Sequence, residues 1–263
     1  MLPITLHPMP AFPQCDGEQW EVGAPDELAH LVALVLVGRV FHARSILEGA
    51  HLSPPSIGES LKDKLRTELH PGSAKGNEHR DGLLFEIICW VAAQIGKTDS
   101  ERIDDPHLKS TTQGTDGVKV SVDPTTKRLT KATIYEYKCT TNHRQKFQSQ
   151  VLKSFGEYFS GDRDNQLAQA VTALLAGFGF DDSQLAEAYD TLIQTRPLAF
   201  DASLTVSPSV FPAEKCVALF KDYDGLGVAP EMRGGNTLPL EDVRAWFSDF
   251  ASRVWAQIET FDV

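Results

Sequence analysis

Two short stretches of the chain carry residue types that can do chemistry together. The run T-D-G-V-K-V-S-V, which begins at Thr115, contains Asp116, and the later run I-Y-E-Y-K contains Glu136 and Lys138. Both runs are typical of strands, and side chains two residues apart on a strand point to the same face. A hairpin between the runs could bring Asp116 beside Glu136 and Lys138. Two carboxylates and one ammonium in a small volume can bind a divalent cation and activate a water.

A third carboxylate, that of Glu86, needs a partner. It is the only charged residue between Asp81 and Lys97, in a stretch that predicts a helix apolar on nearly every face. An unpaired buried carboxylate costs roughly several kcal/mol. A cation held by Asp116 and Glu136 would supply the partner. The alternative is a cap or a salt bridge to a basic residue at either helix end, which the spacing makes hard to reach.

Glu86, T-D-G at Asp116 and E-Y-K at Glu136 and Lys138, in this order, resemble the motif of the PD-(D/E)XK nuclease superfamily. The customary proline before the first Asp is Thr115 here. The resemblance implies a small mixed sheet flanked by helices. It also implies Asp116 and Glu136 as metal ligands, Glu86 as a further ligand directly or through water, and Lys138 as the residue that orients or activates water. Mg²⁺ or Mn²⁺ is the implied cofactor, because hard carboxylate oxygens suit these ions.

The residues around and after this motif are basic. Between Gly117 and Phe155, eight Lys and Arg stand against two acids, a net +6, whereas the chain carries −11 in total and the remainder therefore −17. Basic charge beside an acidic cluster favours a phosphate ligand, although a solvated basic loop and helix would give the same composition. We expect the substrate-binding side chains to be His143, Arg144, Lys146, Gln148, Gln150 and Lys153.

Gln150 is the candidate for the Gln that RecB-like members of the superfamily place on this helix, with Gln148 as the second choice. The alternative is an ordinary solvated helix face. Glu136 and Lys138 could likewise be an exposed cross-strand ion pair. Their face also carries Ala132 and Ile134, which favours a functional site. The sequence predicts that both charged residues are exposed rather than packed.

Composition bounds the class of protein. The chain has 263 residues, is 41% hydrophobic and 23% charged, and fits one large domain or a domain with an appendage. We expect an N-terminal arm and helical part over 1–75 and a restriction-endonuclease-like core with a C-terminal strand and helix over 76–263. No apolar run reaches the roughly 18 residues of a membrane span, and no signal peptide is evident. The four cysteines show no C-x-x-C spacing. We expect a cytoplasmic protein with no membrane partner.

The periodicity predicts an α/β protein of the α+β kind, with a mixed sheet and extra N-terminal helices, because regular βαβ alternation is missing. Residues 1–25 are Pro-rich and predict an extended arm. Expected helices cover 26–47, 57–69, 80–95, 144–159, 163–177, 182–194 and 240–260. Expected strands cover 117–122, 131–138, 203–207 and 216–223, and expected loops cover 71–80, 98–114 and 225–236.

Three functions fit these features. The first is a metal-dependent DNA nuclease, whose layout is similar to the nuclease subunit of the Hachiman antiphage defence systems. That resemblance implies a helicase partner that supplies or controls access to DNA. The loop over 225–236 and the aromatic C-terminal helix would then be docking surfaces, unless the aromatics are core. The second is a stand-alone restriction- or repair-type endonuclease. The third is a non-catalytic DNA- or partner-binding scaffold in which the E-x-K face is structural.

Overall fold

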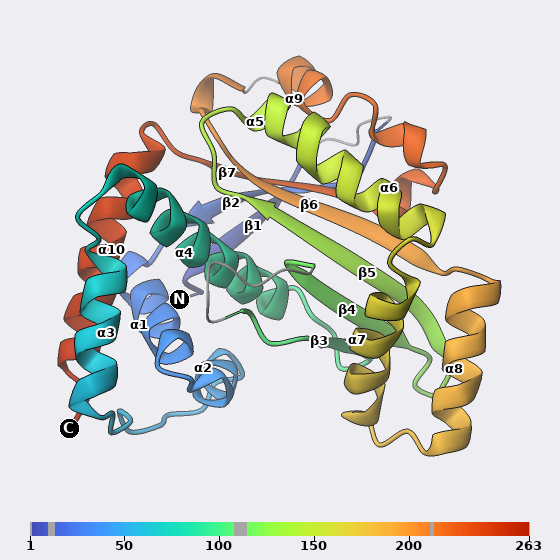
Figure 1. Cartoon of the computed structure of the whole chain (residues 1–263), viewed down its shortest axis with the longest axis horizontal. Coiled ribbons are helices and arrows are strands. Elements are labelled where there is room, and N and C mark those ends of the chain that lie inside the picture. Colours follow the sequence, from blue (N-terminus) through green and yellow to red (C-terminus); the bar gives the residue numbers. More distant parts are fainter. Residues whose placement is uncertain (1, 10–13, 108–114, 211–212, 263) are drawn as a thin grey trace.

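A computed structural model of the chain describes residues 2–9, 14–107, 115–210 and 213–262 (Figure 1). Within these residues the strands form one seven-stranded sheet in the order β1-β2-β7-β6-β5-β4-β3. Helices cover both faces of this sheet (Figure 1). The α+β class with a mixed sheet, predicted from the sequence, is therefore confirmed.

The strands belong to two kinds of pairing. The β3, β4 and β5 strands form an antiparallel meander, β6 and β7 continue it in parallel, and β2 joins β7 in parallel with β1 antiparallel at its edge. Their bounds are β1 (Ile4–Pro8), β2 (Glu18–Val22), β3 (Glu101–Ile103), β4 (Gly117–Val122), β5 (Leu129–Lys138), β6 (Leu198–Val206) and β7 (Arg233–Pro239).

The helices fall into two groups by the sheet face that they cover. One face carries α1 (Pro25–Leu36), α2 (Val40–Leu47), α3 (Glu59–Leu69), α4 (Ala74–Ile95) and α10 (Val243–Glu259). The other carries α5 (His143–Lys146), the π-helical turn η1 (Phe147–Val151), α6 (Leu152–Ser160), α7 (Asp164–Ala176), α8 (Asp182–Gln194) and α9 (Ala213–Leu219). Short 3-10 turns cover Pro208–Val210, Tyr223–Leu226 and Pro230–Met232.

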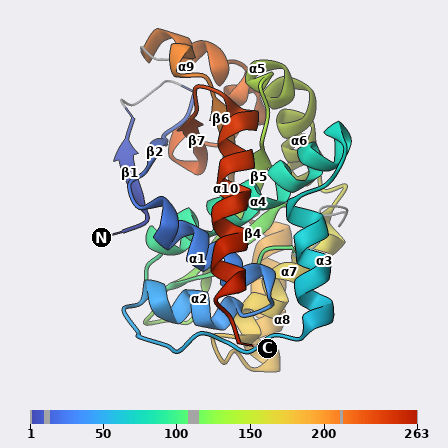
Figure 2. The same cartoon turned by 90° about the vertical axis from the view of Figure 1, so that its left-hand side faces the viewer.

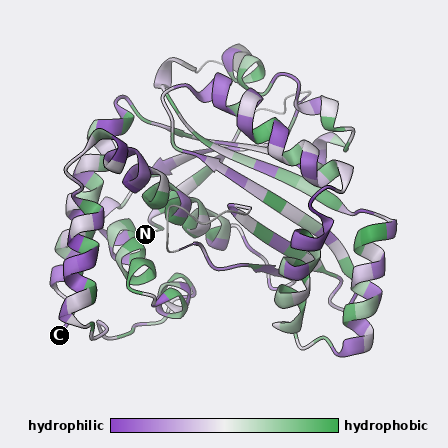
Figure 3. Ribbon diagram, viewed as in Figure 1, coloured by the Kyte–Doolittle hydropathy of each residue, from purple (hydrophilic) through white to green (hydrophobic). Residues whose placement is uncertain are grey.

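Each face of the sheet has its own hydrophobic core, since side chains alternate along the strands. On β5, Ile134 joins the core under α6 and α7, whereas Tyr135 and Tyr137 join the core under α4. Figure 3 shows α1 as largely hydrophobic, and its buried side chains run around most of the helix. The sheet therefore separates two hydrophobic cores. Even-numbered residues of β5 such as Ile134 face the core under α6 and α7, and odd-numbered ones such as Tyr135 face the core under α4.

The helices before residue 75 share one core with helices that follow it. The α10 helix packs against α1, α3 and α4 (Figure 2). Phe247, Phe250 and Val254 of α10 are buried in this core. Trp246 and Trp255 are partly buried against it. These aromatics are thus core residues and do not form the docking surface considered from the sequence.

Three N-terminal features differ from the sequence expectations. The segment expected to be an extended arm supplies β1 and β2. The single helix expected over 26–47 is divided into α1 and α2 at Gly38, whose φ of 76° favours glycine. The loop expected over 71–80 is wrong, because α4 begins at Ala74. Ser73 caps it by accepting a hydrogen bond from the Gly76 N–H at 3.1 Å.

Two C-terminal expectations are also wrong. Residues 216–223, expected as a strand, lie in α9 and the turns after it, since a short apolar run fits either element. The loop expected over 225–236 contains the start of β7. Its glycines lower strand propensity, but packing requires them. A Cβ would lie 2.5 Å from Asp201 Oδ2 at Gly234, and 2.8 Å from Cys15 Sγ at Gly235.

Asp201 on β6 should make stability depend on pH. Burial raises the pKa of its carboxyl from 3.8 to about 7, with Glu18 raising it further and Lys119 and Lys131 lowering it. Because the folded chain holds this proton more tightly, the stabilising contribution is complete below 3.8 and is lost as pH rises through about 7. Relative to wild type, Asp201→Asn should gain stability as pH rises from about 4 to about 7. Urea unfolding across this range tests it; a constant difference would contradict it.

Candidate active site

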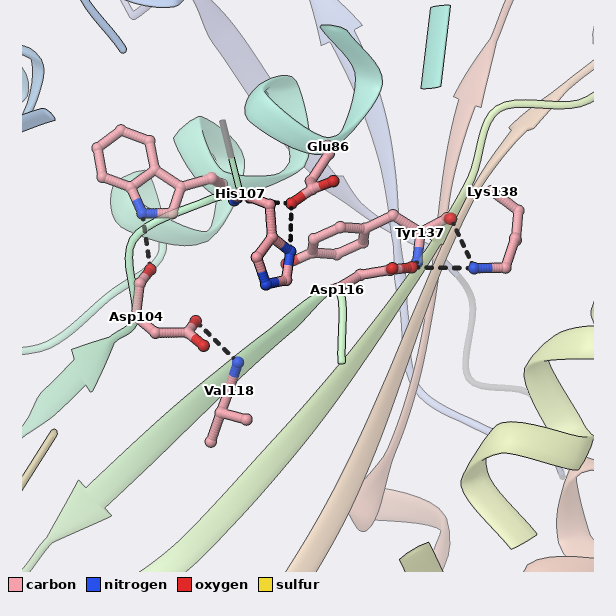
Figure 4. Close-up of polar contacts among 8 residues, drawn as sticks. Glu86, Asp104, His107, Asp116, Val118, Tyr137 and Lys138 are labelled. Carbon is pink, nitrogen blue, oxygen red and sulfur yellow. Dashed lines mark hydrogen bonds and ion pairs between the residues drawn. The ribbon is translucent and has the colours of Figure 1, made fainter. Parts of the chain in front are cut away.

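The β4–β5 hairpin brings Asp116 beside Glu136 and Lys138. Gly117 pairs with Tyr135, so the residue before β4 lies next to the end of β5. Lys138 Nζ lies 2.9 Å from Asp116 Oδ2 and 2.7 Å from Glu136 Oε2 (Figure 4 shows the first contact). One ammonium therefore joins two carboxylates that come from different strands.

The backbone of β5 fixes this arrangement further. The Tyr137 N–H donates to Asp116 Oδ2 at 2.6 Å (Figure 4). Lys138 Nζ also donates to the Tyr137 carbonyl oxygen at 3.0 Å (Figure 4). Charge-assisted hydrogen bonds of this kind are stronger than neutral ones. The backbone of Tyr137 therefore holds both side chains: its N–H binds Asp116 and its carbonyl binds Lys138.

Glu136 is buried, contrary to the expectation of an exposed pair. Only 5% of the residue is accessible, and it shares its face with Ile134 in the core under α6. Its Oε1 accepts a hydrogen bond from Ser154 Oγ of α6 at 2.5 Å. Burial raises the pKa of Glu136, the Lys138 ammonium lowers it, and Asp116 raises it. Each carboxylate oxygen of Glu136 thus has its own donor.

The charge state of Lys138 bears on its chemical role. Burial lowers the pKa of its ammonium, but the carboxylates of Asp116 and Glu136 more than offset this and hold the pKa above its ordinary value. A protonated lysine donates hydrogen bonds and cannot accept a proton. Its three N–H donors are taken by Asp116, Glu136 and the Tyr137 carbonyl, so contact with a water or a phosphate requires one of these bonds to be exchanged. General-base catalysis by Lys138 is disfavoured.

Glu86 is bonded to a residue that the sequence analysis did not choose. Its Oε1 accepts hydrogen bonds from the N–H of His107 at 2.9 Å and from His107 Nδ1 at 3.0 Å (Figure 4). The hydrogen bond from Glu86 raises the pKa of His107, against the lowering effect of burial. The partner thus comes from the loop after β3 and not from either end of α4.

A cavity of about 210 Å³ connects Glu86 with the hairpin. Its lining includes Glu86, Asp116 and Tyr137, together with Glu78 and His79 from the first turns of α4. Glu136 is not part of this lining, because it points to the other face of the sheet. Asp116 lies between the two groups: it contacts Lys138 on one side and borders the cavity of Glu86 on the other.

His107, Ser154 and Asp104 are site residues that the sequence analysis missed. Asp104 Oδ1 accepts from the Val118 N–H at 2.8 Å, and its carbonyl accepts from Trp90 Nε1 at 3.1 Å (Figure 4). Burial raises the pKa of Asp104 to about 7, with the Val118 hydrogen bond acting against it. Ser154 sits on a helix face that its apolar neighbours predict to be buried. No pattern near His107 or Asp104 indicates the contacts they make.

The donor chemistry of this site fits a divalent cation. Two carboxylates, those of Asp116 and Glu136, lie beside the single ammonium of Lys138, and a third, that of Glu86, lines the cavity that Asp116 borders. Hard carboxylate oxygens suit Mg²⁺ or Mn²⁺. Within the described residues, however, no group of three His, Cys, Asp or Glu is placed to hold a metal ion. Asp116 and Glu136 are the pair that would hold it, with Glu86 across the cavity. Bound there, the cation would polarise a phosphodiester and lower the pKa of a water.

The expected substrate-binding residues lie on one continuous helical segment, and they differ in availability. Gln148, Gln150 and Lys153 are exposed, and Lys146 is half-buried. The π-helical turn of Phe147–Val151 carries both glutamines, and such turns are frequent at functional sites. These four side chains can reach a ligand in solution.

Arg144 and His143 are placed differently. Arg144 Nη1 donates to the carbonyls of Leu219 and Lys221 at 3.1 and 2.7 Å, and Nη2 pairs with Asp222 at 2.8 Å. It therefore ties α5 to the segment after α9 and is occupied. His143 is half-buried, and burial lowers its pKa, so it is disfavoured as a cationic phosphate contact.

Part of the basic charge counted from the sequence is neutralised within the fold. Four of the eight Lys and Arg between Gly117 and Phe155 make ion pairs. These pairs are Lys119–Glu101, Arg128–Glu187, Lys138 with Asp116 and Glu136, and Arg144–Asp222. The segment therefore attracts phosphate less strongly than its formal +6 suggests, and Lys146 and Lys153 become the main candidates for backbone contacts.

Replacing Lys146 and Lys153 together by Ala should weaken nucleic-acid binding at every sequence. The slope of log K against log salt should fall by about 1 to 2, because each lysine lost removes one phosphate contact. Fluorescence anisotropy of labelled DNA over a salt series measures this slope. Lys62→Ala with Lys64→Ala on α3 is the matched control, expected to leave the slope unchanged. If the Lys146/Lys153 variant kept the wild-type slope, as the control should, the α5–α6 segment would not be part of the interface.

No protein-family model, curated protein or solved structure matches the chain. Among the described helices, none combines the length and the apolar character that crossing a membrane requires. A function for the chain therefore has to be argued from the geometry of its own residues.

Proposed function

We propose that the chain is a metal-dependent nuclease that hydrolyses DNA phosphodiester bonds. One observation carries the proposal: Lys138 Nζ lies 2.9 Å from Asp116 and 2.7 Å from Glu136 at the end of a β-hairpin. Two carboxylates can hold a divalent cation, and the lysine beside them can contact the phosphate that the cation polarises.

The arrangement of elements around the site supports the proposal. An acid-bearing helix, α4, precedes the meander β3–β4–β5, and β6 returns in parallel beside β5 after the α5–α6 segment. Glu86, T-D-G and E-Y-K occur on these elements in the order of the PD-(D/E)XK motif, on a mixed sheet flanked by helices. This order of elements is the one that the proposal requires.

Each residue would have a distinct task in hydrolysis. Asp116 and Glu136 would hold Mg²⁺ or Mn²⁺, and Ser154 would keep Glu136 oriented. When Asp116 and Glu136 bind the cation, an N–H of Lys138 that they now occupy would be released. That N–H would then donate to a non-bridging phosphate oxygen as the attacking water forms a new P–O bond and the bond to the leaving oxygen breaks. The water's proton passes to solvent, and the leaving oxygen takes a proton in turn. Glu86 would contact the cation through a water across its cavity.

The biological setting that we propose is antiphage defence. The layout is similar to HamA, the nuclease subunit of Hachiman systems, and implies a HamB-like helicase partner. An acidic body with −17 outside the basic segment would restrain free DNA binding, as expected for a nuclease whose partner delivers the substrate. The ion pairs made by four basic residues of this segment act in the same direction.

The proposal is tested by incubating the purified chain with supercoiled plasmid, linear DNA and RNA. Reactions contain Mg²⁺, Mn²⁺ or EDTA, with and without a co-purified helicase. DNA cutting that requires the metal and increases with the helicase is the expected result. Equal cutting by the chain alone would indicate a stand-alone restriction- or repair-type endonuclease. No cutting under any condition would contradict nuclease function.

A second candidate function is a non-catalytic scaffold that binds DNA or a partner. One observation favours it: the three hydrogen bonds of Lys138 close the Asp116–Glu136 pair into a complete network. A scaffold of this kind needs no cation. Titration of Mn²⁺ followed by electron paramagnetic resonance separates the two, since the nuclease should bind Mn²⁺ and lose that binding in Glu136→Gln.

A further inference from the structure

A second cavity, of about 330 Å³, lies on the face of the sheet covered by α4. Its floor is formed by β5, β6 and β7, neighbours in the sheet (Figure 1), and α4 borders it from one side. The volume lies at the lower end of the roughly 300–1,000 Å³ typical of small-molecule sites. Glu136 and Lys138 do not contribute to it.

Small residues line both the helix side and the sheet side of this cavity, which leaves space for a ligand between them. They are Ala92, Ala93 and Gly96 of α4, and Ala199 and Gly234 of the sheet. At Gly234 even a methyl group would lie 2.5 Å from Asp201 Oδ2. The rings of Trp20 and Tyr135 also border the space, and aromatic walls favour a planar, partly apolar ligand.

A carboxylate with spare accepting capacity lies in the floor. Asp201 Oδ1 accepts from Asn236 Nδ2 at 2.7 Å, and Asn236 Oδ1 accepts from the Glu18 N–H at 3.1 Å, which fixes the amide. Within the described part of the chain, Asn236 is the only hydrogen-bond partner of Asp201. Ser203, 1% exposed, also lines the cavity, beside the Cys89 thiol with which it interacts.

Charge is distributed unevenly around Asp201. Lys119 and Lys131 lie toward the β4–β5 side, and Glu18 lies toward β2; all three act on the Asp201 carboxyl electrostatically. Lys119 is paired with Glu101 at 3.1 Å, whereas Lys131 makes no ion pair with any described residue. The cavity is also bordered by Asp16, Glu231 and Arg233. The cavity therefore offers a hydrogen-bond acceptor at Asp201 and a basic group at Lys131, within a lining of mixed charge.

We propose that this cavity binds a nucleotide whose base carries an amino group. The base lies between α4 and the sheet, its amino group donates to Asp201, and its phosphate pairs with Lys131. Carboxylate side chains accept hydrogen bonds from base amino groups in the same way in nucleic-acid readout, and ammonium groups pair with phosphate. The inference does not depend on the proposed nuclease function. Tyr137 borders both this cavity and that of Glu86, so the two sites are neighbours.

Isothermal titration calorimetry of the full chain tests the proposal with GMP, AMP, CMP, UMP, guanosine and inorganic phosphate. At least one of the three amino-bearing nucleotides should bind more tightly than UMP, which has no amino group. Asp201→Asn should weaken that binding at least about 10-fold, the loss of one charge-assisted contact. Lys131→Ala should weaken nucleotide binding and leave guanosine unaffected. Asp190→Asn and Lys64→Ala, both exposed on other helices, are the matched controls and should bind as wild type does.

Three results would overturn the proposal. One is the absence of binding by GMP, AMP and CMP. Another is equal binding of UMP or of phosphate alone, which would indicate a simple anion site. The third is binding that survives Asp201→Asn but is lost in Glu136→Gln, which would place the nucleotide at the candidate active site. Retained binding in Glu136→Gln, with loss in Asp201→Asn, is the expected pattern even if the chain proves to have no nuclease activity.

Discussion

Glu136→Gln is expected to lower metal-dependent DNA cleavage by at least about 100-fold while the chain stays folded. The substitution removes one anionic metal ligand, and preorganised electrostatic groups of this kind are worth about 10² to 10³ in rate. Gln has the shape of Glu and can still accept the hydrogen bond from Ser154. It also removes one of the two carboxylates that pair with Lys138, so thermal stability should fall, but Asp116 still pairs with the ammonium and limits the loss.

Single-turnover cleavage and circular dichroism of the same preparation measure the two effects. Glu187→Gln is the matched control, because Glu187 also pairs with a cation of the basic segment, Arg128, at 2.9 Å but lies exposed on α8. It should cut as wild type does. Undiminished cleavage by Glu136→Gln would remove Glu136 from the metal site and leave the lysine-bridged pair as a structural feature.

The largest expected loss of stability follows replacement of Asp81 by Ala. Asp81 is fully buried on α4, with Oδ1 accepting from Arg80 Nε at 2.9 Å and Nη2 at 2.7 Å. Its Oδ2 accepts from Arg244 Nη1 of α10 at 2.5 Å. Removing the carboxylate leaves the buried Arg80 guanidinium without its partner and releases α10 from α4. We expect a loss of about 3 to 5 kcal/mol in the free energy of unfolding.

Urea unfolding monitored by tryptophan fluorescence gives this free energy. Glu78→Ala is the matched control: Glu78 also pairs with Arg244, at 3.7 Å, but is largely exposed. Exposed ion pairs contribute about 0 to 1 kcal/mol, so the control should be nearly neutral. A loss below about 1 kcal/mol for Asp81→Ala would mean that the two arginines find other partners or solvent.

The hairpin and the contacts of Lys138 with Asp116 and Glu136 were predictable because they are local in sequence. Alternation over Gly117–Val122 and the run ending at Lys138 sets the faces of the two strands, and a short connection makes them neighbours. The contact between Asp116, Glu136 and Lys138 follows from those faces and that register. Most helices were predicted for the same reason, since their apolar periodicity is strong.

The remaining features depend on tertiary packing. Glu136 is buried because α6 covers its face and supplies Ser154, which strand periodicity cannot indicate. Glu86 finds His107 through a loop whose path has no sequence pattern. The glycines of β7 are typical of a loop, yet close packing against Asp201 and Cys15 requires them. Arg144 has the composition of a phosphate contact, but the fold uses it to anchor the segment after α9.

The central claim is that Asp116, Glu136 and Lys138 form a metal-dependent nuclease centre. Its most direct test is cleavage of plasmid DNA by wild type, Lys138→Ala and the exposed control Lys64→Ala, side by side in Mg²⁺, Mn²⁺ and EDTA, with the helicase present. Cutting should require the metal, survive in Lys64→Ala and be lost in Lys138→Ala. Equal metal-dependent cutting by Lys138→Ala would place the catalytic centre elsewhere in the chain and contradict the assignment.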